Sequence, residues 1–268
     1  KLSLYNDRKL EDKLEVKRVP IAFAGDPFQT LNPTGFSWDS VKARFYEKLI
    51  NSRDENYKID FNYKELSYNY RSTKHIVGLN NLVQLMRGIL FDIKGIKAQE
   101  HYFNKDSQSC IFFDENNPLC KDILERNVEN LTIIIPSHES EMTDYIDNDS
   151  LLSELKQSDE RQYNILTPMK AKGLEFSRVV LYKFGEEYRE RYPGLLDQLS
   201  GENDEEDIEK RIPQKYFMNR LFVSLSRAKN KIIIIDTERG IQGLWQNEHL
   251  KNRSRLLENY RVKYDHDI

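Results

Sequence analysis

The chain is poor in cysteine, in long apolar runs and in excess charge of either sign. Its two cysteines, Cys110 and Cys120, are too few for a disulfide framework and favour free thiols. No apolar run approaches a membrane span and no signal peptide is visible, so we expect a cytoplasmic protein without a membrane partner. The formal net charge is −3, so no global basic field indicates a nucleic-acid partner, and any such contact has to come from a local patch.

A length of 268 residues suits one large domain or two smaller ones. The chain starts at Lys1 without a methionine, and we expect it to be part of a longer protein. Apolar runs predict core strands at Val19–Ala24, Tyr57–Phe61, Ser109–Phe113, Leu131–Ile135, Val179–Tyr182 and Ile232–Ile235. Helical spacing follows Thr73, where Ser72 or Thr73 can cap the helix, and Ile146–Leu155 predicts another helix. Strands that alternate with helices predict an α/β fold with a parallel sheet.

The stretch Asn164–Phe184 combines two strand patterns with a polar connection. Pro168 ends the first apolar run, because proline has no amide donor and favours extended geometry in the residue before it. A loop with Lys170, Lys172 and Gly173 follows, and glycine lets the backbone approach a ligand closely. Such a loop can hold a charged ligand at the rim of a sheet. A surface loop with two solvated lysines is the alternative.

Thr167–Phe176 (TPMKAKGLEF) resembles motif V, T-x-H-x-x-K-G-L-E-F, of the UvrD/Rep class of superfamily 1 helicases. Three further segments resemble motifs of that family and occur in the family's order. Gly25–Gln29 is similar to motif III (G-D-x-x-Q), Leu66–Ser72 to motif IV (L-x-x-N-Y-R-S), and Phe222–Ala228 to motif VI (Y-V-A-x-T-R-A). The last segment lies within Tyr216–Lys229, where the apolar residues Phe217, Leu221, Val223 and Leu225 are expected to bury a helix with Arg227 at its end, pointing at a ligand.

The resemblance implies the C-terminal part of an ATP-dependent DNA helicase. Residues 1–56 would be the tail of a first RecA-like domain, and residues 57–268 a second RecA-like domain with a parallel sheet flanked by helices. ATP and Mg²⁺ would lie between the two domains, with the phosphate loop and the magnesium carboxylates on the first. The chain has no G-x-x-x-x-G-K-[S/T] loop, so it is expected to be inactive alone.

The resemblance also implies a set of ATP-site residues. Gln29, Arg71 and Arg227 would act on the γ-phosphate, and Tyr70 would stack on adenine. The remaining implied ATP contacts are Gly173 and Glu175. An arginine pair suits this task because a guanidinium stays ionised and presents a planar fork of donors.

A second implied set contacts single-stranded or partly duplex DNA: Phe36, Trp38, Thr167, Met169 and Lys170. Phe36 and Trp38 can stack on bases, or they can staple the helix that starts near Asp39. Met169 departs from the family pattern, which has a histidine that contacts the DNA backbone. Methionine cannot donate to a phosphate, so this contact is lost or is taken over by Lys170.

Two other interpretations of the sequence compete with this one. Ile111–Glu115 has the apolar run and acidic pair of a magnesium site, but it follows motif IV and the chain has no phosphate loop, so we reject that reading. The second alternative is a degenerate RecA-like module that binds a protein or nucleic acid and hydrolyses nothing. The presence of Gln29, Tyr70, Arg71, Glu175 and Arg227 together argues against it.

Overall fold

The computed structural model describes residues 67–93, 96–103, 110–126, 131–157, 163–200 and 208–247, together with residues 31, 43, 44, 47 and 256. The expected strands Val19–Ala24 and Tyr57–Phe61, and the predicted site residues Gln29, Phe36 and Trp38, lie outside the described residues. Almost all of the expected remnant of a first domain, residues 1–56, does so as well.

The strands are β1 (Tyr68–Thr73), β2 (Glu100–Phe103), β3 (Cys110–Asp114), β4 (Leu131–Ile134), β5 (Asn164–Leu166), β6 (Phe176–Tyr182) and β7 (Ala228–Asp236). The α-helices are α3 (Lys74–Phe91), α4 (Pro118–Arg126), α5 (Met142–Asn148), α6 (Ser150–Gln157), α7 (Pro168–Ala171), α8 (Phe184–Arg191), α9 (Ile208–Leu225) and α10 (Glu238–Gly240). Shorter helical turns are Glu139–Glu141, Leu195–Ser200 and a π-helix at Ile241–Trp245. No helix in these described ranges is both long enough and apolar enough to cross a membrane.

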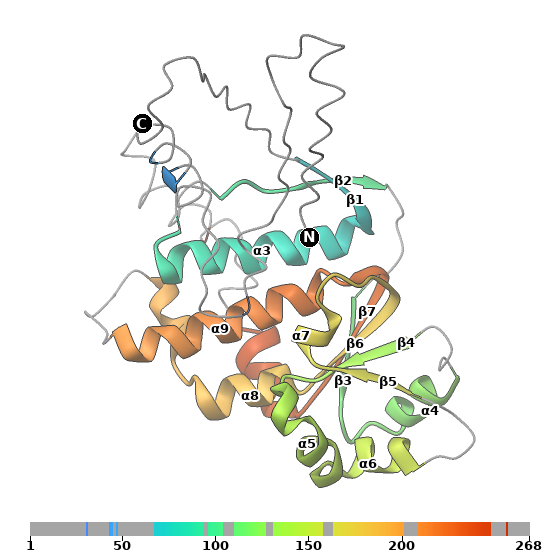
Figure 1. The fold of residues 1–268 in the computed structure, drawn as a ribbon. Helices are drawn as coiled ribbons and strands as arrows, with labels where there is room; N and C mark the ends of the chain where they lie inside the picture. Colours follow the sequence, from blue (N-terminus) through green and yellow to red (C-terminus); the bar gives the residue numbers. More distant parts are fainter. Residues whose placement is uncertain are drawn as a thin grey trace, which may run out of the picture.

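Five of the strands form one parallel sheet in the order β3-β7-β6-β4-β5 (Figure 1). Leu181 in the middle strand pairs with Ile234 on one side and with Ile134 on the other. The predicted α/β fold with a parallel sheet flanked by helices is confirmed.

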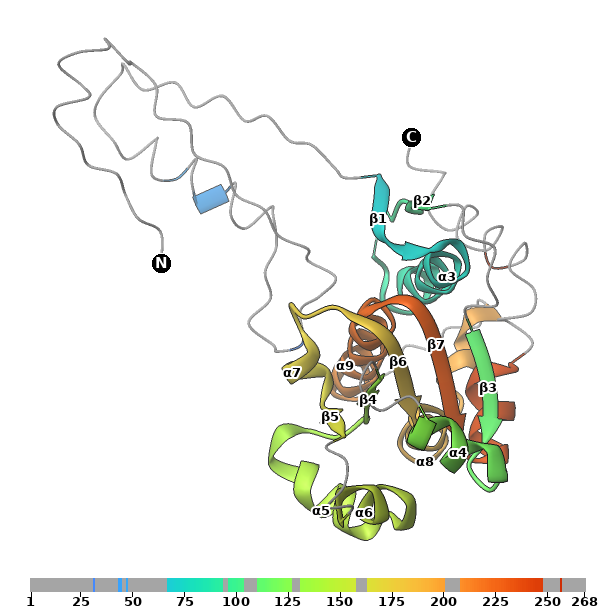
Figure 2. The same ribbon diagram turned by 90° about the vertical axis from the view of Figure 1, so that its right-hand side faces the viewer.

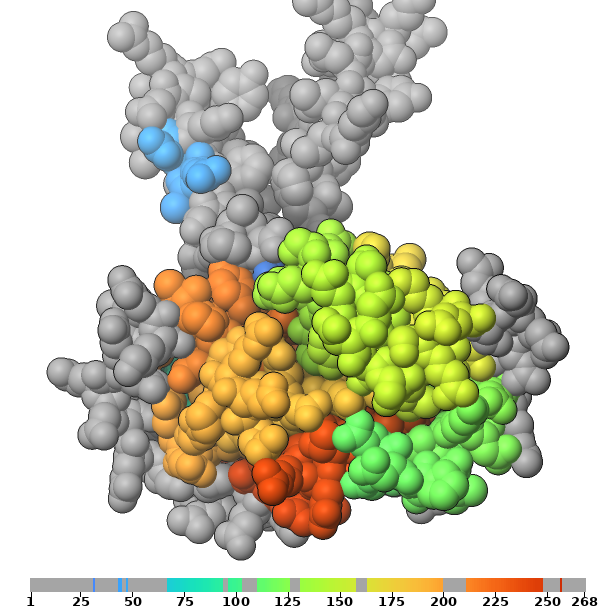
Figure 3. Space-filling view, turned by 90° about the horizontal axis from the view of Figure 1, so that it is seen from below, coloured from blue at the N-terminus to red at the C-terminus, as the bar shows by residue number. Residues whose placement is uncertain are grey.

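Alternation along the strands divides the core between the two faces of the sheet. Val179, Leu181, Ile232 and Ile234 belong to a cluster with residues of α3, α8 and α9. Their neighbours in sequence face a second cluster, formed with α4, α5 and α6. Both faces are covered, which explains why these strands are continuously apolar. Figure 3 shows the second set of helices from outside, with α4, α5 and α6 beside α8.

The expected single helix at Ile146–Leu155 is wrong. The chain forms α5 and α6, and Asp149 between them is extended, with φ −96° and ψ 123°. The carboxylate of Asp149 explains the break, because its Oδ1 accepts from the Leu152 amide at 3.0 Å and so caps α6. The expected loop after Thr167 is also partly wrong, since Pro168–Ala171 forms the helical turn α7.

The strands β1 and β2 form a separate two-stranded parallel sheet beside the start of α3 (Figure 2). Thr73 is the N-cap residue of α3, as expected, but its side chain makes no capping hydrogen bond. Helix α3 packs along α9, and the buried Arg87 bridges the two by donating to Asn219 and by lying 5.1 Å above the Phe222 ring. This packing fixes β1 close to the loop between α9 and β7.

Candidate functional site

The candidate site lies where β6 and β7 begin, at the amino edge of the large sheet. Here β1 docks onto β7, because the Ser72 hydroxyl donates to the Ala228 carbonyl at 2.7 Å. Ser72 is 1% exposed, so the hydrogen bond is shielded from water. This contact places Arg71, which precedes Ser72, next to the loop that ends in Arg227.

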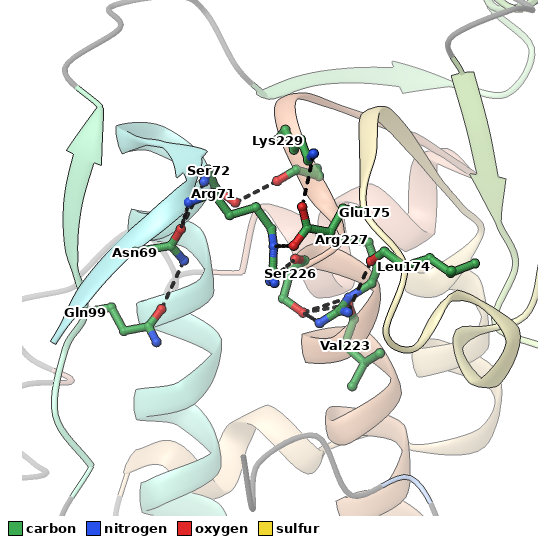
Figure 4. A network of polar contacts seen from close by, with 11 residues as sticks. Asn69, Arg71, Ser72, Gln99, Leu174, Glu175, Val223, Ser226, Arg227 and Lys229 are labelled. Carbon is green, nitrogen blue, oxygen red and sulfur yellow. Dashed lines mark hydrogen bonds and ion pairs between the residues drawn. The ribbon is translucent and has the colours of Figure 1, made fainter. Parts of the chain in front are cut away.

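Asn69 shapes the backbone around Arg71 (Figure 4). Its Oδ1 accepts from the amide of Arg71 at 3.0 Å and from the amide of Ser72 at 2.9 Å. Its Nδ2 donates to Gln99 Oε1 at 3.1 Å, which ties the turn to the segment before β2. The sequence did not predict a role for Asn69, although an asparagine side chain commonly accepts from the backbone amide two residues further on.

Glu175 is the anionic centre of the site. Its Oε1 accepts from Arg71 Nε at 2.5 Å, and its Oε2 lies 3.1 Å from Lys229 Nζ (Figure 4). The Lys229 hydrogen bond, followed by that of Arg71, lowers the pKa of the Glu175 carboxyl below its usual value. One carboxylate is therefore shared by two cations. Lys229 was not among the residues predicted from the sequence, which offers no signal beyond a basic residue near motif VI.

Arg227 is buried, with 1% of its surface exposed. Its Nε donates to the Val223 carbonyl at 3.1 Å, its Nη2 to Ser226 Oγ at 2.8 Å, and its Nη1 to the Leu174 carbonyl at 3.3 Å. The side chain thus connects the end of α9 to the loop before β6. In this conformation the side chain is directed into the protein, and the expected action of Arg227 on a γ-phosphate stays a prediction.

Arg71 and Arg227 meet at Ser226. Arg71 Nη1 donates to the Ser226 carbonyl at 3.4 Å, while Arg227 binds the hydroxyl of the same residue. The Phe176 amide donates to the Arg227 carbonyl at 2.9 Å, so the segments Thr167–Phe176 and Phe222–Ala228 are also joined through backbone. The structure brings together Arg71, Glu175 and Arg227, which are far apart in sequence. Ser226, like Asn69 and Lys229, was not predicted from the sequence.

Gly173 and its neighbours form the turn that delivers Glu175 to the site. Gly173 has φ 83°, a conformation that glycine adopts without the strain that a Cβ would cause. The turn is closed by the Leu174 amide, which donates to the Ala171 carbonyl at 3.1 Å. This gives Gly173 a conformational role whether or not it contacts a ligand.

Tyr70 projects into solvent with 60% of its surface exposed. It lies on β1 between two other exposed tyrosines, with ring centroids 6.2 Å from Tyr68 and 4.8 Å from Tyr102. An exposed aromatic surface of this kind is available for stacking.

The predicted DNA contacts within the described residues lie around α7. Thr167 is fully buried, and its hydroxyl accepts from the Lys170 amide at 3.3 Å as the N-cap of α7. Met169 is half-buried and Lys170 is exposed. Lys170 Nζ lies 3.8 Å from Met142 Sδ, a weak contact that leaves this cation accessible. Lys170 is therefore the member of this set that is best placed to reach a nucleic-acid backbone.

A different polar cluster occupies the opposite, carboxyl edge of the sheet. Lys183 follows β6 with φ 53° and forms ion pairs with Glu115 at 2.7 Å and Asp149 at 2.8 Å. Tyr182 also donates to Asp149, at 2.9 Å. Glu115 therefore takes part in an ion pair at this edge. No group of three or more His, Cys, Asp or Glu within the described ranges could hold a metal ion.

No family model and no curated protein matches the chain. One similar solved structure is the C-terminal domain of a possible DNA helicase from Lactobacillus plantarum WCFS1. The two share 16% sequence identity with a TM-score of 0.35, and the match covers 68% of this chain and 96% of that chain. This likeness is too slight to support an assignment. What the chain does has to be inferred from its own site.

Proposed function

We propose that the chain is the C-terminal part of an ATP-dependent DNA translocase of the UvrD/Rep helicase type. In this proposal Arg71, Glu175 and Arg227 form the half of an ATP site that one domain contributes. A second domain with a phosphate loop and Mg²⁺-binding carboxylates would supply the other half.

The observation that carries the proposal is the convergence of Arg71, Glu175 and Arg227 at one edge of the sheet. A cluster with more cations than carboxylates suits a polyphosphate, whose charge is spread over many oxygens. Arginine contributed from outside the phosphate loop accelerates phosphoryl transfer by about 10³–10⁵-fold in related enzymes. Because Arg227 is buried here, its proposed action on the γ-phosphate requires its side chain to turn out when the second domain binds.

The proposal also gives tasks to the other residues predicted from the sequence. Tyr70, exposed on the strand that carries Arg71, would stack on the adenine ring. Gln29 would sense the γ-phosphate, while Phe36, Trp38 and Lys170 would contact single-stranded DNA. Met169 would make no phosphate contact.

Binding of ATP and of inorganic tripolyphosphate to the chain tests the proposal, measured by calorimetry at low salt. Arg71→Ala is expected to weaken both ligands about tenfold or more, because each loses a charge-assisted hydrogen bond. Tyr70→Ala should weaken ATP by about 1–3 kcal/mol through lost base stacking and leave tripolyphosphate unchanged. Lys231→Ala, on the same strand as Lys229, is the control. Equal binding by wild type and Arg71→Ala would refute the proposed site.

A further inference from the structure

The contacts of Lys229 distinguish it from Lys231, the other lysine of β7. Strand β7 has one more residue than β6 at this point: Phe176 pairs with Ala228, but Arg178 pairs with Lys231. Lys229 and Asn230 thus both lie opposite Ser177, as in a β-bulge. Asn230 Nδ2 fixes the irregularity by donating to Ser177 Oγ at 3.0 Å. Bulges redirect side chains and are frequent beside functional sites.

The bulge follows the residue on which β1 is docked. Ala228 accepts the Ser72 hydroxyl, so Lys229 starts next to Arg71 and extends towards the same carboxylate. Its side chain keeps 45% of its surface exposed, and that of Arg71 keeps 33%. Neither cation has another ion pair in the part of the chain that the structure describes.

The geometry of the carboxylate is the informative feature. Arginine and carboxylate commonly pair through two parallel hydrogen bonds. Here only one oxygen of Glu175, Oε1, accepts from Arg71, through Nε. The other oxygen, Oε2, pairs with Lys229. The Nη2 group of Arg71 makes no hydrogen bond to any of the described residues.

We propose that Lys229 is a positioning residue of this anion site. By holding Oε2 of Glu175, it prevents the carboxylate from closing onto Arg71 as a two-point pair. Arg71 then keeps donors for a polyphosphate, the ligand class that the site takes. This inference rests on the proposed function, because it presumes that Arg71 meets the phosphates of ATP.

Tripolyphosphate is the probe that tests it, because it lacks a ribose and cannot hydrogen-bond to Glu175 through a sugar. Lys229→Gln is expected to weaken tripolyphosphate about tenfold, as Glu175 closes onto Arg71. Lys229→Arg should bind nearly as well as wild type, since arginine also holds a carboxylate oxygen. Lys231→Gln, two residues further along β7, should have no effect.

The decisive comparison repeats Lys229→Gln in a Glu175→Gln background. If Lys229 acts through Glu175, the second substitution removes the competitor of the ligand, and Lys229→Gln should then weaken binding less than twofold. An equal loss in both backgrounds would show that Lys229 acts by its own charge, and it would overturn the positioning role. No loss in either background would overturn it too. In that case Arg71→Ala separates two explanations. If Arg71→Ala also leaves binding unchanged, the proposed function is wrong. If Arg71→Ala weakens binding, only the proposed role of Lys229 is wrong.

Discussion

At the scale of single residues, burial separates Arg227 from the other cations of the site. Its guanidinium holds the loop before β6 to the end of α9 through three acceptors, and a truncated variant would lose all three of these hydrogen bonds. A sequence motif could identify this arginine as important, but it could not show that the side chain points inwards. That depends on Leu174 and Ser226, which only the tertiary structure brings within reach.

Arg227→Ala is therefore expected to lower stability as well as any activity. Losing hydrogen bonds to a charged group costs about 1.5–3 kcal/mol in the free energy of unfolding. Arg227→Lys should recover only part, because lysine lacks the planar fork. Urea unfolding of both variants measures this, with the exposed Arg189→Ala on α8 as control. A variant as stable as Arg189→Ala would contradict the packing role of Arg227.

The ion pairs of Glu175 are expected to stabilise the folded chain at neutral pH and to lose this effect in acid. Lys229 and Arg71 lower its pKa in the folded state below the usual 4.5. A lowered carboxyl pKa stabilises the folded state at neutral pH, and this stabilisation is lost as the pH falls through the folded-state value. Wild type should thus be more stable than Glu175→Gln above about pH 5, and the difference should shrink below pH 4. Unfolding curves across this range decide it, and a difference that does not change with pH would contradict the ion pairs.

At the scale of elements, α8 meets α10 through the close approach of Gly185 to Gly240 and through the buried carboxylate of Asp236. Asp236 ends β7 and is fully buried, and burial raises the pKa of its carboxyl. Its carboxylate accepts from the amides of Gly185 at 2.6 Å and Glu186 at 3.0 Å, and from Trp245 Nε1 at 2.9 Å. The side chain therefore holds the start of α8 against the π-helix at Ile241–Trp245.

Gly240→Ala is expected to disrupt this junction. Its Cβ would lie 2.2 Å from Asp236 Oδ1 and 2.7 Å from the Glu186 amide nitrogen, and the backbone group cannot move aside without shifting α8. Gly78→Ala in α3 is the matched control, because nothing lies within 4 Å of its Cβ. It should stabilise the chain by about 0.5–1 kcal/mol. The temperature of thermal unfolding should thus fall in Gly240→Ala and rise in Gly78→Ala. An unchanged unfolding temperature in Gly240→Ala would contradict the proposed packing at this junction.

The elements of the sheet were largely predictable from sequence, while their exact ends were not. Continuous apolar runs such as Leu131–Ile135 indicated strands buried on both faces, and β4 forms there. The break at Asp149 was not predicted. Apolar residues at helical spacing lie on both sides of it, Ile146 before and Leu152 after, so the pattern resembles one continuous helix. The helical turn α7 was missed since Pro168 signalled the end of a strand and equally suits the first turn of a helix.

At the scale of the whole molecule, the proposed function makes this site half of a larger one. The motif order predicted which residues belong together, and the structure places Arg71, Glu175 and Arg227 in one network. Their action on ATP stays a prediction. Lys229 and Asn69 could not be predicted, because their parts depend on a bulge in β7 and on the docking of β1.

The chain alone is expected to show no ATP turnover, even with single-stranded DNA, because it has no phosphate loop. In a longer protein that contains such a loop, Arg227→Ala should reduce turnover by about 10³-fold or more per folded molecule. Binding of single-stranded DNA without nucleotide should be nearly unchanged. Normal turnover in folded Arg227→Ala would leave this arginine with a packing role only.

The proposed function requires that ATP binds at the amino edge of β6 and β7. The most direct measurement is a map of amide chemical-shift changes in the isotope-labelled chain as ATP is added at low salt, which detects weak binding. We expect the largest changes at Arg71, Glu175, Ser226 and Lys229. We also expect Arg71→Ala to abolish them. Changes centred on Lys183 and Asp149 at the opposite edge, or none at saturating ATP, would contradict it.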